Sequence, residues 1–200
     1  MTDADLGAAL PLPVPSAEMQ DRLARRRSAP AQSLAAPGPT RAEVERILLL
    51  GARTPDHGKL FPWRFVVMGP QSRADLALAL APLAARQPDP GKAGKTLAKL
   101  TAPPLTILVL STPVPDHKVP VWEQQLSAGA VCMNLEHAAN ALGYAASWIT
   151  DWYSYDPEAL ALFDVRPAER VAGFIHIGTL AEPPLERPRP DVAALTSWRD

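Results

Sequence analysis

The stretch PLTILVL (residues 104–110) is continuously apolar and has the length of a single strand. A strand that is apolar at every position is buried on both faces, so we expect it at the centre of a sheet. Three other segments predict strands: WRFVVM (63–68), YAASWIT (144–150) and RVAGFIHIGT (170–179). Because helical segments separate these strands, alternation alone predicts an α/β fold with a parallel sheet.

Two of the predicted helices carry clear end signals. Thr40 and Glu43 have the spacing of a capping box, which predicts a helix that runs to about Arg53. Residues 121–142 predict a helix about 30 Å long, which Gly143 would end in a left-handed C-cap. Shorter helices are predicted at 17–26, at 71–85 with Ser72 as N-cap, and at 157–163 with Asp156 as N-cap. Residues 87–96 are predicted to be a loop, and KTLAKL (95–100) is expected to add a helical turn or two.

Composition limits the class of protein. The 200 residues include 20 Lys and Arg against 21 Asp and Glu, a formal charge of −1 that favours neither nucleic acid nor an anionic membrane as a partner. The single cysteine, Cys132, excludes an intrachain disulfide and fits a reducing compartment, so we expect a cytoplasmic protein. Residues 1–17, rich in Ala, Pro and Leu, are expected to form a flexible extension before a single domain of residues 18–200.

Three common kinds of site are poorly supported. The motif GKAGKT (91–96) resembles the end of a P-loop, but the first glycine of that motif would fall at Asp89 and no strand precedes it. The four histidines lack the spacing of a metal site, so no metal is expected. A serine hydrolase needs a G-x-S-x-G elbow, which is absent, and Ser127 in a predicted helix is expected to allow close helix packing.

Two basic clusters indicate an anion-binding site. Arg26 and Arg27 with Ser28 stand at the end of a predicted helix, and guanidinium groups can bind phosphate oxygens bidentately. Arg187 and Arg189 lie two residues apart on a proline-stiffened segment, so both side chains can turn toward one ligand. A solvated helix end is the alternative interpretation of the first cluster.

The loop RTPDHGKLFPWRF (53–65) is unusually rich in polar groups. His57 is flanked by Arg53 and Lys59, and Pro62 with Trp63 precedes the strand. A lone loop histidine is usually exposed or bonded to backbone. The neighbouring cations and the aromatic residue favour a ligand-binding role instead.

Together these segments resemble the nitroreductase family, in its compact bacterial branch of NAD(P)H nitroreductases. The resemblance runs in order from about Asp21 to Pro190. It rests on RRS at 26–28, ARTPDH at 52–57, PWRF at 62–65, HKVPxWEQ at 117–124, SAG at 127–129, SWIT at 147–150 and GFIHIGT at 173–179. It implies an α+β fold with a mixed, largely antiparallel sheet surrounded by helices, in an intertwined homodimer with FMN at the subunit interface. That expectation replaces the parallel sheet.

The resemblance also implies roles for individual residues. Arg26, Arg27 and Ser28 would hold the FMN phosphate and ribityl chain, while Arg53 and His57 would reach FMN from the partner subunit. Trp148, Ile149 and Thr150 would line the isoalloxazine ring, residues 138–143 would contact the nicotinamide nucleotide, and Arg187 and Arg189 would complete the phosphate site. The family pattern has Gly where this chain has Asp151, so the turn beside the flavin is expected to differ.

The implied activity is transfer of a hydride from NADH or NADPH through flavin N5 to a nitroaromatic, a quinone or a related small-molecule acceptor, with ping-pong kinetics. Arg53 or Lys59 is the candidate cation for the charge that develops on the reduced flavin. No catalytic acid or base is assigned. Two alternatives stay open: an FMN-binding or carrier protein of the same fold, whose ring Trp148 and a mobile region at 92–99 would cover, and a scaffold without cofactor.

Overall fold

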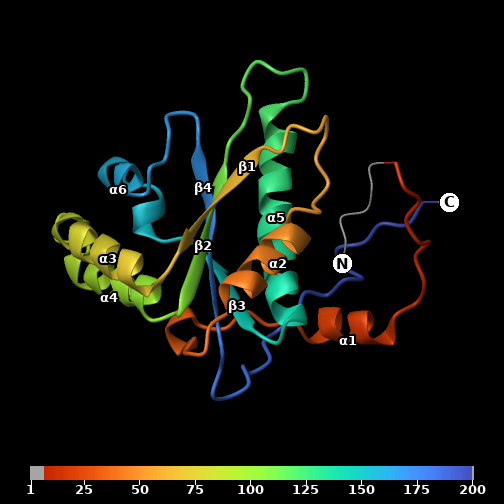
Figure 1. The fold of residues 1–200 in the computed structure, drawn as a ribbon, viewed down its shortest axis with the longest axis horizontal. Coiled ribbons are helices and arrows are strands. Elements are labelled where there is room, and N and C mark those ends of the chain that lie inside the picture. The colour runs from red at the N-terminus through yellow and green to blue at the C-terminus, as the bar shows by residue number, and fades with distance from the viewer. Residues whose placement is uncertain (1–6, 200) are drawn as a thin grey trace.

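The computed structural model describes residues 7–199, and its centre is a four-stranded sheet (Figure 1). The strands are β1 (Trp63–Met68), β2 (Leu105–Ser111), β3 (Ala145–Ile149) and β4 (Arg170–Gly178), in the spatial order β1-β2-β4-β3. All three neighbouring pairs in this sheet are antiparallel. The parallel sheet predicted from alternation is therefore wrong, whereas the α+β class is confirmed.

The order of the strands explains why alternation misled. Since β2 and β3 are both antiparallel to β4, they run parallel to each other, as expected for two strands joined by a helix. The last strand, β4, lies between them and converts the sheet to antiparallel pairing. Between β1 and β2 the chain forms two helices instead of one, which lets it return in the opposite direction.

The central position of β2 is confirmed, because all seven of its residues are buried. Its two faces support separate cores. Ile107 and Val109 pack in the core that includes α2 (Arg41–Gly51) and α5 (Val121–Ala141). Leu108 and Leu110 pack in the opposite core with residues of α3 (Pro70–Ala84), α4 (Pro90–Thr101) and α6 (Pro157–Leu162). Figure 1 shows these two groups of helices on opposite sides of the sheet.

Most predicted helix ends agree with the structure. The capping box at Thr40 is present in full, although α2 ends at Gly51 instead of near Arg53. Gly143 follows the long helix α5 with a φ of 89°, the left-handed conformation expected at a C-cap. Asp156 caps α6 by accepting from two backbone amides.

Two predictions in the second core are wrong. Residues 87–96 were expected to be a loop, but Asp89 accepts a hydrogen bond from the amide of Lys92 and starts α4 at Pro90. This helix buries Ala93, Thr96 and Leu100, which recur with helical spacing. The lysines between them make this pattern hard to recognise in the sequence. Ser72 is not the N-cap of α3, because the helix already begins at Pro70 after Gly69.

The segments at the two ends of the chain are largely without regular structure. The predicted extension of residues 1–17 has its first six residues outside the described part, and residues 8–15 are exposed without helix or strand. Ser16 then caps α1 (Ala17–Arg25). Within residues 7–199, none of the helices combines the length and the apolar character needed to cross a membrane.

Candidate functional site

The RRS segment (residues 26–28) lies between α1 and the first residues of β3. Ala29 donates a backbone hydrogen bond to Ala146 of this strand. Arg26 Nη1 lies 3.3 Å from Ser28 Oγ, and both groups contact the Glu136 carboxylate of α5, at 3.6 Å and 3.4 Å respectively. The structure therefore brings Arg26 and Ser28 together, as the sequence predicts.

The C-terminal arginines behave differently from each other. Arg189 Nη2 donates to the backbone oxygen of Arg26 at 3.0 Å, and Arg27 Nε donates to the backbone oxygen of Leu185 at 2.9 Å. These two bonds hold the C-terminal segment against the RRS segment. For Arg187 the recorded contact is made by its backbone amide, which donates to Glu186. Arg189 thus joins the site directly, whereas the geometry does not place the Arg187 guanidinium there.

A cleft of about 560 Å³ lies beside the RRS segment. Four arginines line it, Arg22, Arg25, Arg26 and Arg27, together with residues from the end of α5 that include Asn140, Ala141 and Gly143. Glu18 and Asp21 pair with two of the arginines, so the cleft keeps an excess of positive charge. Such a lining suits a ligand that carries phosphate.

His57 lies apart from the RRS segment within one chain, whereas Arg53 lies nearer, because its cleft shares Glu18, Arg22 and Ala141 with the cleft beside that segment. Arg53 is exposed and lines a neighbouring cleft of about 420 Å³ with Asn134 and His137. His57 Nδ1 lies 2.7 Å from the Glu123 carboxylate near the start of α5. Glu123 and Glu136 are thirteen residues apart on this helix, which corresponds to about 20 Å along its axis. A single chain therefore does not bring His57 to Arg26 and Ser28.

The loop that carries His57 is anchored to α5 by Ser127. Its hydroxyl accepts from Trp63 Nε1 at 3.2 Å and donates to the backbone oxygen of Pro55 at 2.8 Å. Ser127 was expected to allow close helix packing, but its contacts show that it fixes this loop. Asp56 adds to the loop's order by accepting from the amide of Leu60 at 2.8 Å.

Trp148 lies at the end of β3 with its indole across the neighbouring strand. Its Nε1 donates to the backbone oxygen of Ala172 at 3.0 Å. A Cβ on Gly173 would overlap the indole, so glycine is required there for the ring to lie in this position. The side chain of Trp148 is partly exposed, and it offers a flat surface to a planar ligand.

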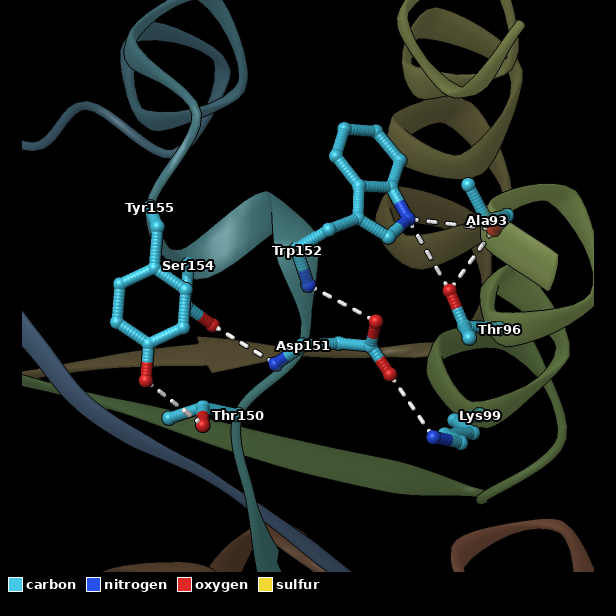
Figure 2. Close-up of polar contacts among 8 residues, drawn as sticks. All are labelled: Ala93, Thr96, Lys99, Thr150, Asp151, Trp152, Ser154 and Tyr155. Atoms are coloured by element: carbon cyan, nitrogen blue, oxygen red, sulfur yellow. Dashed lines mark hydrogen bonds and ion pairs between the residues drawn. The ribbon is translucent and has the colours of Figure 1, made fainter. Parts of the chain in front are cut away.

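Figure 2 shows the turn that follows Trp148 and Ile149. The Tyr155 hydroxyl lies 3.0 Å from Thr150 Oγ1, while Asp151 caps the short helix η2 (Trp152–Ser154) and pairs with Lys99 of α4 at 2.8 Å. The resemblance led us to expect Gly at position 151, but the φ of Asp151, −146°, is an extended conformation that any residue adopts. The turn is therefore built without glycine and is fastened to α4.

Two residues of this region were missed by the sequence prediction. Glu136 has a side chain that is 4% exposed, and burial raises the pKa of its carboxyl, while Arg26, the Trp148 amide and Ser28 act in the opposite direction. Its signal in the sequence is that it is the only acid among residues 124–143, most of which are apolar. Lys99 was overlooked because its partner Asp151 is 52 residues away in the sequence.

The arrangement fits a phosphate-bearing planar cofactor better than a metal. Arginines and a serine hydroxyl converge at the RRS segment, and Trp148 with the Thr150 turn forms a flat, partly exposed surface joined to it through Glu136. In contrast, residues 7–199 contain no group of three His, Cys, Asp or Glu side chains that could hold a metal ion. FMN carries both a phosphate and a planar ring.

Comparison with known proteins identifies the family of the chain. Residues 23–179 match the Nitroreductase family. The Escherichia coli K12 protein "Putative NAD(P)H nitroreductase YdjA" is 35% identical over 159 residues, which are 78% of this chain and 85% of the relative. A Haemophilus influenzae protein named "Putative NAD(P)H nitroreductase" is 36% identical over 151 residues, 74% of this chain and 82% of the relative.

A solved structure shares the fold at low sequence identity. The Bacteroides fragilis nitroreductase with bound FMN superposes with a TM-score of 0.73 at 19% identity, and the match covers 92% of this chain and all of the other. The family match spans most of the chain, and the two relatives exceed a third identity over most of their own length. The chain belongs to the nitroreductase family.

Proposed function

We propose that this protein is an FMN-dependent oxidoreductase that uses NADH or NADPH to reduce nitroaromatics, quinones or related small-molecule acceptors. The observation that carries the proposal is the convergence of Arg26 and Ser28 beside a cleft lined by four arginines. The names of the relatives and the FMN in the Bacteroides fragilis structure support the same assignment.

The residues present can hold each part of FMN. Arg26, Arg27 and Ser28 would bind the phosphate and ribityl chain, and Arg189 would stabilise that segment through the Arg26 backbone. Arg187 stays a proposed phosphate contact that would need its side chain to turn. A second set of residues, Trp148, Ile149 and Thr150, would line the ring.

FMN supplies the redox chemistry when bound, by accepting a hydride at N5 and passing it on. The protein binds and orients the reactants and controls the local charge. Arg53 or Lys59 is the proposed cation near the ring, because fixed positive charge favours a group that becomes negative. Lys99 is a third cation close to this region, but its pairing with Asp151 offsets its charge. Acceptors can take protons from solvent, so no acid or base is required.

The proposed active unit is a homodimer with FMN between the subunits. In one chain, the separation of about 20 Å along α5 keeps His57 away from Arg26. A second copy could present its own Arg53 and His57 to the first copy's RRS segment. Exposed apolar side chains on α5, Trp122 and Leu126, and Phe61 in the loop beside it supply surface for such an interface. Residues 18–200 would act as one domain in a reducing, cytoplasmic setting.

The carrier-protein alternative loses part of its support. It required a mobile region at residues 92–99 that would cover the flavin, but these residues belong to the helix α4. Thr96 of this helix is fixed to the Trp152 indole at 3.1 Å. The remaining observation in its favour is the bulk of Trp148, which also serves to pack a flavin ring.

The experiment that tests the proposal is steady-state kinetics on the purified full chain. We expect yellow protein that releases FMN on denaturation and oxidises NADH or NADPH when a quinone or nitroaromatic is present. Double-reciprocal plots at several acceptor concentrations should be parallel, as a ping-pong reaction requires. A colourless protein that cannot be reconstituted with FMN would contradict the proposal.

A further inference from the structure

Glu136 occupies an unusual place for a carboxylate. It lies inside α5, its side chain is 4% exposed, and it contacts the side chains of both Arg26 and Ser28. The backbone amide of Trp148 faces the same carboxylate. Glu136 therefore joins the segment proposed to hold the phosphate to the strand proposed to lie against the ring.

Few hydrogen-bond donors are available between Ser28 and Glu136. Ser28 Oγ carries one proton, which it donates to Glu136 Oε1 at 3.4 Å, while Arg26 Nη1 donates to the same Ser28 oxygen at 3.3 Å. A phosphate dianion can only accept hydrogen bonds. If Ser28 is to bind phosphate, its proton must turn away from Glu136.

When the Ser28 proton points away, the negative charge of the ionised Glu136 carboxylate is poorly compensated. Glu136 would lose the Ser28 hydrogen bond, and the Arg26 charge would be shared with a dianion that approaches from outside. A buried carboxylate without compensation is costly, and a second negative charge nearby increases that cost. Protonation removes both problems, because a neutral carboxyl group can donate to Ser28 Oγ.

We propose that Glu136 is a positioning residue for the flavin phosphate: it takes up one proton from solvent when FMN binds, and its carboxyl group then donates to Ser28 Oγ while Ser28 donates to the phosphate. This inference rests on the proposed function, since it assumes that residues 26–28 hold the phosphate. The proposal predicts that the affinity of the chain for FMN depends on pH.

The groups around Glu136 act on its pKa in opposite directions: burial raises it, whereas Arg26, the Trp148 amide and Ser28 lower it. Burial raises the pKa of its carboxyl even before a ligand is bound. Arg26 is the cation that faces it, Trp148 contributes a backbone amide from β3, and Cys132 lies one turn earlier on α5 with a thiol whose pKa is raised to about 12. The thiol stays neutral, so an approaching phosphate dianion adds the new charge. That charge moves the pKa of Glu136 further upward.

Titration calorimetry of the FMN-free full chain tests the proposal. FMN is added between pH 7 and 8.5, where its phosphate stays dianionic, in buffers with different ionisation enthalpies. A group whose pKa is higher in the complex favours binding below that pKa and loses the benefit as pH rises through it. We expect net proton uptake, with an affinity that falls by up to about tenfold per pH unit.

Riboflavin and two variants locate the proton. Riboflavin lacks the phosphate, so its binding should take up no proton. Glu136→Gln imitates the neutral carboxyl group, and we expect FMN affinity at least equal to that of the unmodified protein, without dependence on pH. Glu169→Gln is the matched control, because Glu169 is also a buried carboxylate paired with an arginine, Arg64, but belongs to a different ion pair. It should keep the proton uptake.

The outcomes separate the two proposals. If the unmodified protein binds no FMN, the proposed function fails. If it binds FMN without proton uptake, the inference on Glu136 is wrong while the proposed function stands, and this result needs no variant. Weaker FMN binding by folded Glu136→Gln, or uptake equal to that of the unmodified protein, would also overturn the role of Glu136.

Discussion

The indole of Trp148 lies over Gly173 of the neighbouring strand, where any β-carbon would overlap the ring. The two residues occupy adjacent strands, and Trp148 Nε1 is bonded to the backbone of Ala172 next to this glycine. The position of the Trp148 ring at the proposed flavin surface therefore requires glycine at position 173 of β4.

Replacement of Gly173 by alanine should displace the Trp148 ring. We expect a loss of about 1–3 kcal/mol in the free energy of unfolding, as for other forced increases in packed volume, and a changed visible circular dichroism of bound FMN. Urea unfolding and the dichroism spectrum measure the two effects. Gly94→Ala is the control, because a Cβ at Gly94 meets no neighbouring atom within 4 Å. Unchanged stability and spectrum in Gly173→Ala would show that the ring does not depend on this glycine.

Arg26→Ala should weaken FMN binding. A hydrogen bond to a charged group contributes roughly 1.5–3 kcal/mol, so we expect about a 10- to 100-fold higher Kd in a fluorescence titration of the FMN-free protein. Arg41→Ala serves as the control, since Arg41 forms an exposed ion pair with Glu45 on α2. Equal FMN affinity in the two variants would remove Arg26 from the site.

A mixed dimer can show which subunit supplies His57. We expect Arg26→Ala and His57→Ala homodimers each to bind FMN poorly, because each variant affects both sites. If His57 reaches across the interface, a heterodimer of the two variants contains one intact site and recovers up to half of the normal FMN content. Differently tagged chains allow its isolation. Recovery should be absent if His57 serves its own subunit, and also in the control heterodimer of Arg26→Ala with Ser28→Ala.

The partly buried ion pair between Arg64 and Glu169 should make stability depend on pH. Two hydrogen bonds join the side chains, at 2.7 and 2.8 Å, and they lower the pKa of Glu169. A carboxyl with a lowered pKa stabilises the fold above its unfolded pKa and loses this effect as pH falls through the folded value. The stability difference between the unmodified protein and Glu169→Gln should therefore be full at pH 7 and shrink below about pH 4.5. A difference that stays constant down to pH 3 would contradict this role.

The sequence predicted well those helix ends and strands whose signal comes from residues close together in the chain. The capping box at Thr40, the C-cap at Gly143 and the buried strand β2 depend on residues that are close in the chain. Strand direction could not be obtained in this way, because β4 inserts between β2 and β3 through contacts between distant segments. The resemblance to a known family, rather than periodicity, corrected that prediction.

The candidate site, too, was predicted only in part. The RRS segment was recognisable because its residue types bind anions, and the structure does place Arg26 beside Ser28. Glu136 and Lys99 were not recognisable, since their importance comes from partners far away in sequence, Arg26 and Asp151. The proposed placement of His57 across a subunit interface came from the family resemblance, and the separation of His57 from Arg26 along α5 supports it.

Anaerobic mixing of the FMN-loaded protein with NADH and, separately, with NADPH tests the central claim most directly. The claim predicts that at least one nucleotide bleaches the visible absorption of the flavin in a single turnover, and that a quinone or nitroaromatic then restores it. If neither nucleotide reduces the bound flavin, the protein is not an NAD(P)H-dependent reductase, and the carrier-protein alternative is favoured.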